Sequence, residues 1–160
     1  MTDMEAHLDL HMWMVVSTRT VSRIADILGK SDDVIHYSDL AADFLVVLKE
    51  HFWDEDRQIY DEFYIDEDGN KKFDGHTGYL NFFPLFLEGI DPSDDRFEVM
   101  MNKLVSNTTG MWSDYGIRSL SKFDPYYRLG DDYWTSPIWM NINFLITSAL
   151  HSYSTSTEVS

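Results

Sequence analysis

Apolar side chains recur at three- and four-residue steps through the N-terminal third of the chain, in two runs separated by Gly29. Because an α-helix turns once in about 3.6 residues, such steps line up on one helix face. The first predicted helix runs from about Asp3 to Leu28, with the inward stripe Met4, Leu8, Met12, Val15, Val16, Ile24 and Leu28. The second runs from a capping Ser31 to about His51, with the inward stripe Val34, Leu40, Phe44, Leu45 and Leu48. Since glycine suits the residue after a helix end, the pattern predicts an αα-hairpin.

Three further helices are expected. Residues 78–87 are strongly apolar, but Pro84 interrupts them, and proline inside a helix costs about 3 kcal/mol unless it lies in the first turn or kinks the helix. Ser93 is expected to cap the next helix, whose inward residues are Phe97, Met100, Met101, Leu104 and Val105. These two helices form a second predicted hairpin. Pro137 suits the first turn of the last helix, predicted from Ile138 to about His151.

Residues 52–73 carry β-forming residues on both sides of a turn centred on Gly69, so a short β-hairpin excursion is expected there. Asp66, Asp68 and Asn70 imitate a calcium loop, but the glycine stands at the fourth place and not at the sixth. His7 and His11 have the spacing of zinc ligands, but no third ligand is evident. We therefore expect neither a metal nor a cofactor.

The charge balance restricts the partners of the chain. Its 160 residues include 28 Asp and Glu against 12 Lys and Arg, and the formal net charge of −16 disfavours nucleic acid and anionic membrane surfaces. No run of about 18 apolar residues and no leader-like N-terminus occurs, so neither membrane contact by this segment nor a targeting signal is expected. At 44% hydrophobic residues the chain is too apolar to be disordered, and it should fold.

The stretch from Trp112 to Asn143 combines aromatic rings with hydrogen-bonding side chains. Its members are Trp112, Asp114, Tyr115, Arg118, Asp124, Tyr126, Tyr127, Tyr133, Trp134, Trp139, Asn141 and Asn143. An aromatic face stacks on the CH face of a sugar ring, and fixed donors and acceptors bind sugar hydroxyls. The stretch is therefore typical of a sugar-binding site. An aromatic-rich loop under a helical core is the alternative.

Glu5 and Asp9 are four residues apart and share a face of the predicted first helix. Like charges at this spacing repel by a few tenths of a kcal/mol, so the pair costs stability unless water or a ligand absorbs the charge. A solvated acidic face at a helix N-terminus is the simpler interpretation of the residues alone.

Several segments together resemble a known family. They are EAHLDLHMW at Glu5–Trp13, GYLNFFPLFL at Gly78–Leu87, and WSDYGIRSLS, DPYY and YWTSPIWMNIN between Trp112 and Asn143. In this order they resemble the catalytic domain of glycoside hydrolase family 63, the family of processing α-glucosidase I (mannosyl-oligosaccharide glucosidase). Long motifs in a shared order are a specific signal. The WSDYGIRSLS motif argues against a trehalase or glucoamylase relative.

The resemblance implies an all-α fold, an (α/α)6 toroid, of which residues 1–160 are expected to form one partial domain. About five helices in αα-hairpins and the β-hairpin excursion are expected in this part. A ring of twelve helices, at about 11 to 12 residues each plus loops, needs well over twice this length. The resemblance also implies an inverting glycosidase that removes the terminal α-linked glucose of N-glycan precursors, glucosylated high-mannose oligosaccharides, in the endoplasmic reticulum lumen or membrane.

By the same resemblance, Glu5 and Asp9 are active-site acids. Glycan contacts are expected at Trp112, Tyr115, Arg118, Tyr126, Tyr127, Trp134, Trp139 and Asn141. For Trp139 an ordinary core position is the alternative, and for Arg118 a buried ion pair. We expect the acids, Arg118 and the aromatic side chains to converge on one concave surface.

Trp53-Asp54-Glu55 resembles a separate W-D-E-G-F motif of the family, but Asp56 and Arg57 replace its Gly and Phe. The catalytic acid is therefore not assigned to Asp54, which is expected at a helix exit. The resemblance implies that the catalytic acid and base both lie outside this chain, in the remainder of a longer protein, and the chain alone is expected to be inactive. A non-catalytic glycan-binding or structural remnant of the same fold is the alternative function.

Overall fold

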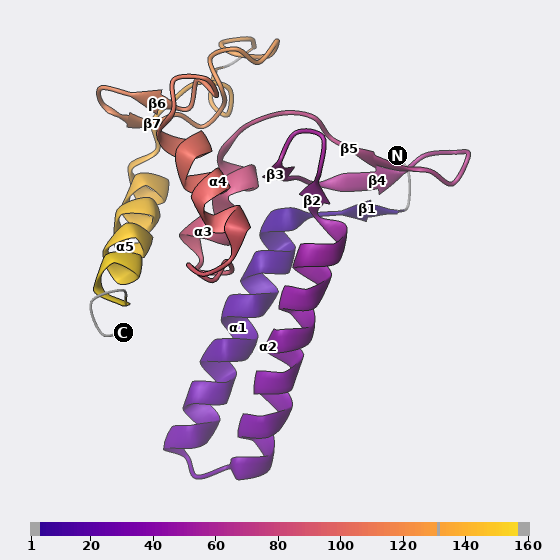
Figure 1. The fold of residues 1–160 in the computed structure, drawn as a ribbon, viewed down its shortest axis with the longest axis vertical. Helices are drawn as coiled ribbons and strands as arrows, with labels where there is room; N and C mark the ends of the chain where they lie inside the picture. Colours follow the sequence, from indigo (N-terminus) through magenta and orange to yellow (C-terminus); the bar gives the residue numbers. More distant parts are fainter. Residues whose placement is uncertain (1–3, 131, 157–160) are drawn as a thin grey trace. The chain divides into compact units, whose positions relative to one another are not determined.

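The computed structural model describes residues 4–130 and 132–156, and the chain divides into two compact units, one as far as Phe73 and one from Asp74 onward. In the first unit, helices α1 (Leu8–Ile27) and α2 (Ser31–His51) lie side by side as an antiparallel hairpin (Figure 1). Gly29 joins them with φ at +67°, and the N–H groups of Gly29 and Lys30 donate to the carbonyl oxygens of Asp26 (3.0 Å) and Ala25 (2.9 Å). This is a Schellman helix end, so the predicted hairpin and its glycine are confirmed.

The first helix begins later than the apolar pattern predicts. Glu5 and Ala6 form the short strand β1 (Glu5–Ala6), paired with β4 (Phe63–Ile65), and the extended His7 is the N-cap of α1. The prediction that Glu5 lies on this helix is therefore wrong. The strand pairing satisfies backbone groups that a longer helix would otherwise have bonded within itself.

The inner face of α1 is apolar in its first half and includes buried hydroxyl side chains in its second half. Its buried residues are Leu8, Met12, Val15, Thr18, Ser22 and Ala25. Met4, Ile24 and Leu28, predicted to face inward, are exposed. Burial of Ser22 is possible because its hydroxyl bonds the Ser38 hydroxyl at 2.8 Å and the Val34 carbonyl oxygen at 3.2 Å across the hairpin.

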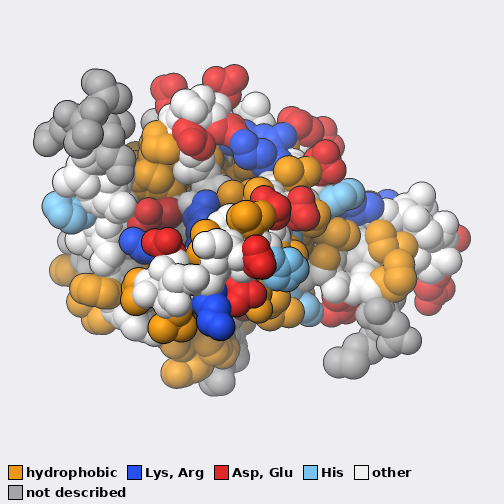
Figure 2. Space-filling view, turned by 90° about the horizontal axis from the view of Figure 1, so that it is seen from below, with side chains coloured by type: hydrophobic (Ala, Val, Ile, Leu, Met, Phe, Trp, Pro, Cys, Tyr) orange, Lys and Arg blue, Asp and Glu red, His pale blue; other side chains and the backbone are white. Residues whose placement is uncertain are grey.

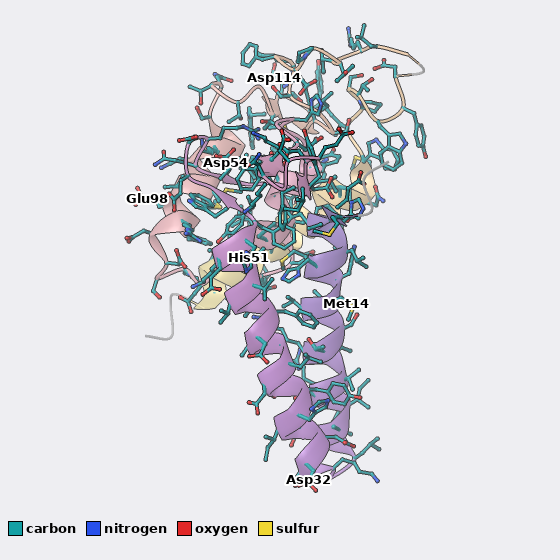
Figure 3. All side chains as sticks on the ribbon, turned by 90° about the vertical axis from the view of Figure 1, so that its right-hand side faces the viewer. Met14, Asp32, His51, Asp54, Glu98 and Asp114 are labelled. Carbon is teal, nitrogen blue, oxygen red and sulfur yellow. The ribbon has the colours of Figure 1, made fainter. Side chains whose placement is uncertain are left out.

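A second apolar stripe on α1 remains exposed. Its residues, again at helical spacing, are Leu10, Met14, Val21 and Ile24, followed by Leu28 at the C-cap. Figure 3 shows Met14 on the outer side of the hairpin, whose two ends carry Asp32 and His51.

Residues 53–73 form the predicted β-excursion. Strands β2 (Trp53–Asp54) and β3 (Ile59–Tyr60) pair antiparallel, and a three-stranded sheet has the order β1-β4-β5, with β5 at Lys71–Phe73. Gly69, with φ at +81°, makes the turn between β4 and β5. The Asp66 carboxylate accepts the N–H groups of Asp68 (3.1 Å) and Asn70 (2.8 Å), so it stabilises this turn.

The second unit contains a 3-10 turn η1 (Tyr79–Phe82), helices α3 (Phe83–Phe86), α4 (Asp95–Val105) and α5 (Met140–Ser156), and a hairpin of β6 (Trp112–Ser113) and β7 (Gly116–Ile117). The described residues thus hold five α-helices, as predicted, although the third has only four residues, follows directly on η1 and has Pro84 in its first turn. Asp94 caps α4 in place of Ser93, because its carboxylate accepts the Arg96 N–H at 3.0 Å. The core of this unit consists of Tyr79, Phe82, Phe83, Leu85, Phe86, Ile90, Met100, Leu104, Met111, Ile117, Ile146, Ala149 and Tyr153.

The surface is acidic in many places. Figure 2 shows Asp and Glu side chains scattered over the visible face, as a net charge of −16 requires. In the part of the chain that the structure describes, no helix has the length and apolar character needed to cross a membrane.

Candidate functional site

The Tyr79 hydroxyl holds the aromatic stretch against η1 within the second unit. This buried hydroxyl donates to the Ile117 carbonyl oxygen (2.6 Å) and accepts the N–H of Trp139 (3.0 Å) and the Nδ2 group of Asn143 (3.1 Å). Burial raises the pKa of Tyr79, and the hydrogen bonds from Trp139 and Asn143 oppose this rise. One hydroxyl therefore connects η1, strand β7 and the start of α5.

Asn143 completes this connection from α5. Its Oδ1 accepts the Ile117 N–H at 2.8 Å, and its Nδ2 donates to the carbonyl oxygens of Ile117 (3.1 Å) and Trp139 (3.0 Å). A Cβ on Gly116 would lie 2.7 Å from Asn143 Oδ1, so only glycine allows β7 to approach so closely. Asn141, the amide predicted to bind substrate, is exposed in the first turn of α5.

Three aromatic rings form a cluster in front of α5. Trp134 and Trp139 stack with centroids 4.5 Å apart and an interplanar angle of 21°, and Tyr133 meets both edge-on at 5.2 and 4.8 Å. The Trp139 indole N–H donates to the Tyr133 carbonyl oxygen at 3.3 Å. Trp134 is 66% exposed and Tyr133 56%, whereas Trp139 is partly buried. The cluster thus presents aromatic surface to solvent on a braced support.

The β6–β7 hairpin carries two more predicted contact residues. Trp112 is partly exposed on β6, and Tyr115, in the turn beside Asp114 (Figure 3), is 87% exposed. Arg118 donates from Nη1 to the carbonyl oxygens of Gly110 (3.2 Å) and Trp112. The Arg118 guanidinium therefore braces the base of this hairpin through carbonyl oxygens, where the alternative from sequence was an ion pair.

Tyr126 and Tyr127 lie in a turn that begins at Asp124. The Asp124 carboxylate accepts the Tyr126 N–H at 2.9 Å, and its backbone carbonyl oxygen accepts the Tyr127 N–H at 3.0 Å. Tyr126 is exposed and Tyr127 partly buried. The same carboxylate pairs with His76, a residue that the sequence analysis did not single out.

In the first unit, Glu5 and Asp9 flank the corner between β1 and α1. His7 stands between them in sequence, with Nδ1 3.3 Å from Glu62 Oε1 and Nε2 3.9 Å from Glu5 Oε2. Glu62 also accepts the Leu8 N–H at 3.3 Å, and Asp9 Oδ1 accepts the Leu10 N–H at 2.6 Å. The two acids therefore lie on different elements, and the helical i,i+4 repulsion expected between them does not apply.

Glu62 is a further carboxylate at this corner that the sequence analysis did not identify. Burial raises the pKa of Glu62; the hydrogen bond and charge of His7 lower it, and the charge of Asp9 raises it. Its only sequence signal is an acidic residue between two short β-runs.

Asp54, just beyond the end of α2, is buried in β2. Its Oδ1 accepts the N–H groups of Asp56 (3.0 Å) and Arg57 (3.1 Å), and Arg57 Nη1 lies 3.9 Å from its Oδ2. Arg57 also pairs with the buried Asp61. This geometry gives Asp54 a structural task in the β2–β3 turn. No group of three or more His, Cys, Asp or Glu among residues 4–130 and 132–156 is arranged to hold a metal ion.

Comparison with known proteins identifies the family. All of residues 1–160 match the model of the glycosyl hydrolase family 63 C-terminal domain. The chain belongs to glycoside hydrolase family 63. Two family relatives are a probable mannosyl-oligosaccharide glucosidase of Schizosaccharomyces pombe (36% identity over 147 residues) and the mannosyl-oligosaccharide glucosidase of Saccharomyces cerevisiae (32% over 151 residues).

These alignments cover 92% and 93% of this chain but 18% of each relative, so the chain spans less than a fifth of their length. Among solved structures, a family 63 mannosylglycerate hydrolase from Thermus thermophilus in complex with Tris matches with a TM-score of 0.75 at 19% identity. That match covers 94% of this chain and 34% of the hydrolase chain, and at this identity it shows a shared fold.

Proposed function

We propose that this chain is part of the catalytic domain of a glycosidase that hydrolyses the terminal α-linked glucose of N-glycan precursors, and that the aromatic face of its second unit contacts the glycan. The observation that carries this proposal is the stacked Trp134–Trp139 pair, with Trp134 exposed and Trp139 partly buried beneath it, in a chain of family 63. Sugar rings stack on such surfaces through their CH faces. The names of the two fungal relatives support a glucosylated high-mannose oligosaccharide as the substrate.

The proposed architecture is an (α/α)6 toroid, of which residues 1–160 form one part of a single domain. The exposed apolar stripe of α1 supports it, since a helix with two apolar faces packs against neighbours on both. The endoplasmic reticulum, the compartment of N-glycan processing implied by the resemblance, is the proposed location.

Within that domain we propose Glu5 and Asp9 as active-site acids forming one wall of the pocket. An inverting glycosidase needs two carboxyl groups about 6.5 to 9.5 Å apart, on opposite sides of the scissile bond, with room for a water. Glu5, on β1, and Asp9, in the first turn of α1, lie close together at the junction of these two elements, so we do not assign them to opposite sides of the scissile bond. In this proposal they accept hydrogen bonds from substrate hydroxyls, while the catalytic acid and base come from other parts of a longer polypeptide.

A second candidate function is glycan binding without hydrolysis. It is favoured by one observation: the Trp134–Trp139 pair, the β6–β7 hairpin and the Tyr79–Asn143 connection all lie within the second unit. A binding face built in this way needs no catalytic carboxylate.

Glucose release tests the proposal. The purified 160-residue chain should release no glucose from a glucosylated high-mannose glycan, whereas the longer polypeptide that the proposal predicts should release it with inversion. In that polypeptide, Asp9→Asn should lower kcat/KM by about 10²-fold or more, and Asp33→Asn, on the exposed first turn of α2, should leave it unchanged. Turnover by the short chain that is abolished by Asp54→Asn would overturn this assignment, and it would place the catalytic acid in the W-D-E segment.

A further inference from the structure

His76 and Asp124 form a close pair in the second unit. His76 Nδ1 lies 2.8 Å from Asp124 Oδ2, and the Asp124 side chain is only 5% exposed, against 39% for His76. The His76 ring also packs against the ring of Tyr126, with centroids 5.0 Å apart and an interplanar angle of 56°. Three side chains thus form a continuous contact from a buried carboxylate to an exposed aromatic ring.

The two oxygens of the Asp124 carboxylate have different partners. Oδ1 accepts the Tyr126 N–H at 2.9 Å, the hydrogen bond that an aspartate at the start of a turn ordinarily makes. Oδ2 bonds His76, which is 48 residues away in the sequence. Because a carboxylate is costly to bury without donors, this second bond is part of what allows Asp124 to be buried. A turn alone does not require it.

Tyr126 is therefore fixed twice. Its backbone is held by Asp124, and its ring is held by the imidazole that the same carboxylate orients. Tyr126 nevertheless remains 56% exposed, so its ring packs against His76 without being covered. An ordered, exposed ring binds a sugar face with less loss of conformational freedom than a mobile ring does.

We propose that Asp124 and His76 are positioning residues for a glycan contact made by the exposed face of Tyr126. This contact is additional to the Trp134–Trp139 pair, and the inference rests on the glycan-binding face of the proposed function. The ligand class is a neutral oligosaccharide, whose CH face stacks on Tyr126. Loss of either positioning residue releases the Tyr126 ring and weakens binding, although the ring that stacks on the sugar is still present.

The test is an NMR titration of the 160-residue chain with a glucosylated high-mannose oligosaccharide. Indole N–H signals of Trp134 and Trp139 report on the proposed function, and ring signals of Tyr126 report on this inference. The ring signals of Tyr126 should shift on binding. His76→Ala should weaken binding about tenfold, and His76→Gln, which keeps a donor toward Asp124 but no ring, should weaken it less. The matched control His36→Ala, at an exposed histidine of α2, should bind as the wild type does.

Three results separate the two proposals. Shifts at the indoles without shifts at Tyr126, or unchanged affinity in His76→Ala, would overturn the positioning role and leave the proposed function standing. No shift at any of these signals would overturn both. If His76→Ala loses the amide dispersion of a folded protein, Asp124→Asn decides, because an asparagine retains the turn acceptor for Tyr126. Its affinity should fall about tenfold, and an unchanged affinity would refute the inference.

Discussion

Asn143 Nδ2 donates to the Tyr79 hydroxyl across 3.1 Å, although 64 residues separate the two in the chain. Through this bond and the contacts of both side chains with Ile117, the β6–β7 hairpin, η1 and the first turn of α5 are held together. The predicted glycan-contact residues Trp112, Arg118 and Trp139 all adjoin these elements. The amide and hydroxyl pair therefore determines where the aromatic surface lies.

Removing the Asn143 amide should destabilise the second unit. Asn143→Ala leaves the Ile117 N–H without its acceptor and the Tyr79 hydroxyl with one donor fewer, which should cost about 1 to 3 kcal/mol. Asn141→Ala, two residues earlier and exposed, should stay within about 0.5 kcal/mol of the wild type. Urea unfolding followed by tryptophan fluorescence measures both. Equal costs for the two variants would contradict the assigned role.

Glycine at position 116 should be indispensable. Gly116→Ala places a Cβ 2.7 Å from Asn143 Oδ1 and 3.0 Å from Ile138 Cγ2, at a φ of +135° that L side chains rarely adopt. The expected cost is about 3 kcal/mol or more, because backbone strain and a clash add together.

Gly130→Ala is the matched control for this change. Gly130 also has a positive φ, +75°, but no atom of the described residues lies within 4 Å of an added Cβ. It should therefore cost only about 1 kcal/mol of backbone strain. Thermal unfolding of both variants separates the clash from the strain, and a similar loss in both would show that the approach of β7 to Asn143 is unimportant.

The α1–α2 hairpin should lose stability as the pH falls below about 6.5. Burial lowers the pKa of His11, only partly offset by its hydrogen bond to the Phe44 carbonyl oxygen (2.7 Å). The folded state thus favours neutral His11, and protons bound by the unfolded chain pull the equilibrium toward unfolding at low pH. His11→Phe keeps the aromatic packing on Phe44 and Phe52 and should reduce the fall in Tm between about pH 8 and pH 5. An unaltered pH profile in this variant would refute the assignment to His11.

Asp54 should matter for stability through its turn. Asp54→Ala removes the acceptor of the backbone N–H groups of Asp56 and Arg57, which should cost about 1 to 3 kcal/mol of folding stability. Asp56→Ala, two residues along and exposed, is the control and should cost less than about 0.5 kcal/mol. Chemical denaturation compares them. A tolerated Asp54→Ala would remove the structural explanation for this buried carboxylate.

The sequence by itself determined the features that depend on neighbouring residues. Two helical runs separated by Gly29 predicted the hairpin of α1 and α2, and the β-forming residues around Gly69 predicted the excursion. Helical periodicity and turn preference are local properties, so they can be read in a short window of sequence. The co-ordered motifs likewise indicated family 63, which the match of the whole chain confirms.

Only the tertiary structure decided which of several similar residues takes a given structural role. Glu5 leaves the helix because β1 pairs with β4, and Asn143 rather than Asn141 is the amide that holds the aromatic stretch. His76 meets Asp124 across 48 residues. Each outcome depends on hydrogen bonds between segments far apart in the chain. A local pattern carries no information about such partners, because the free energy that selects them appears only when both segments are folded.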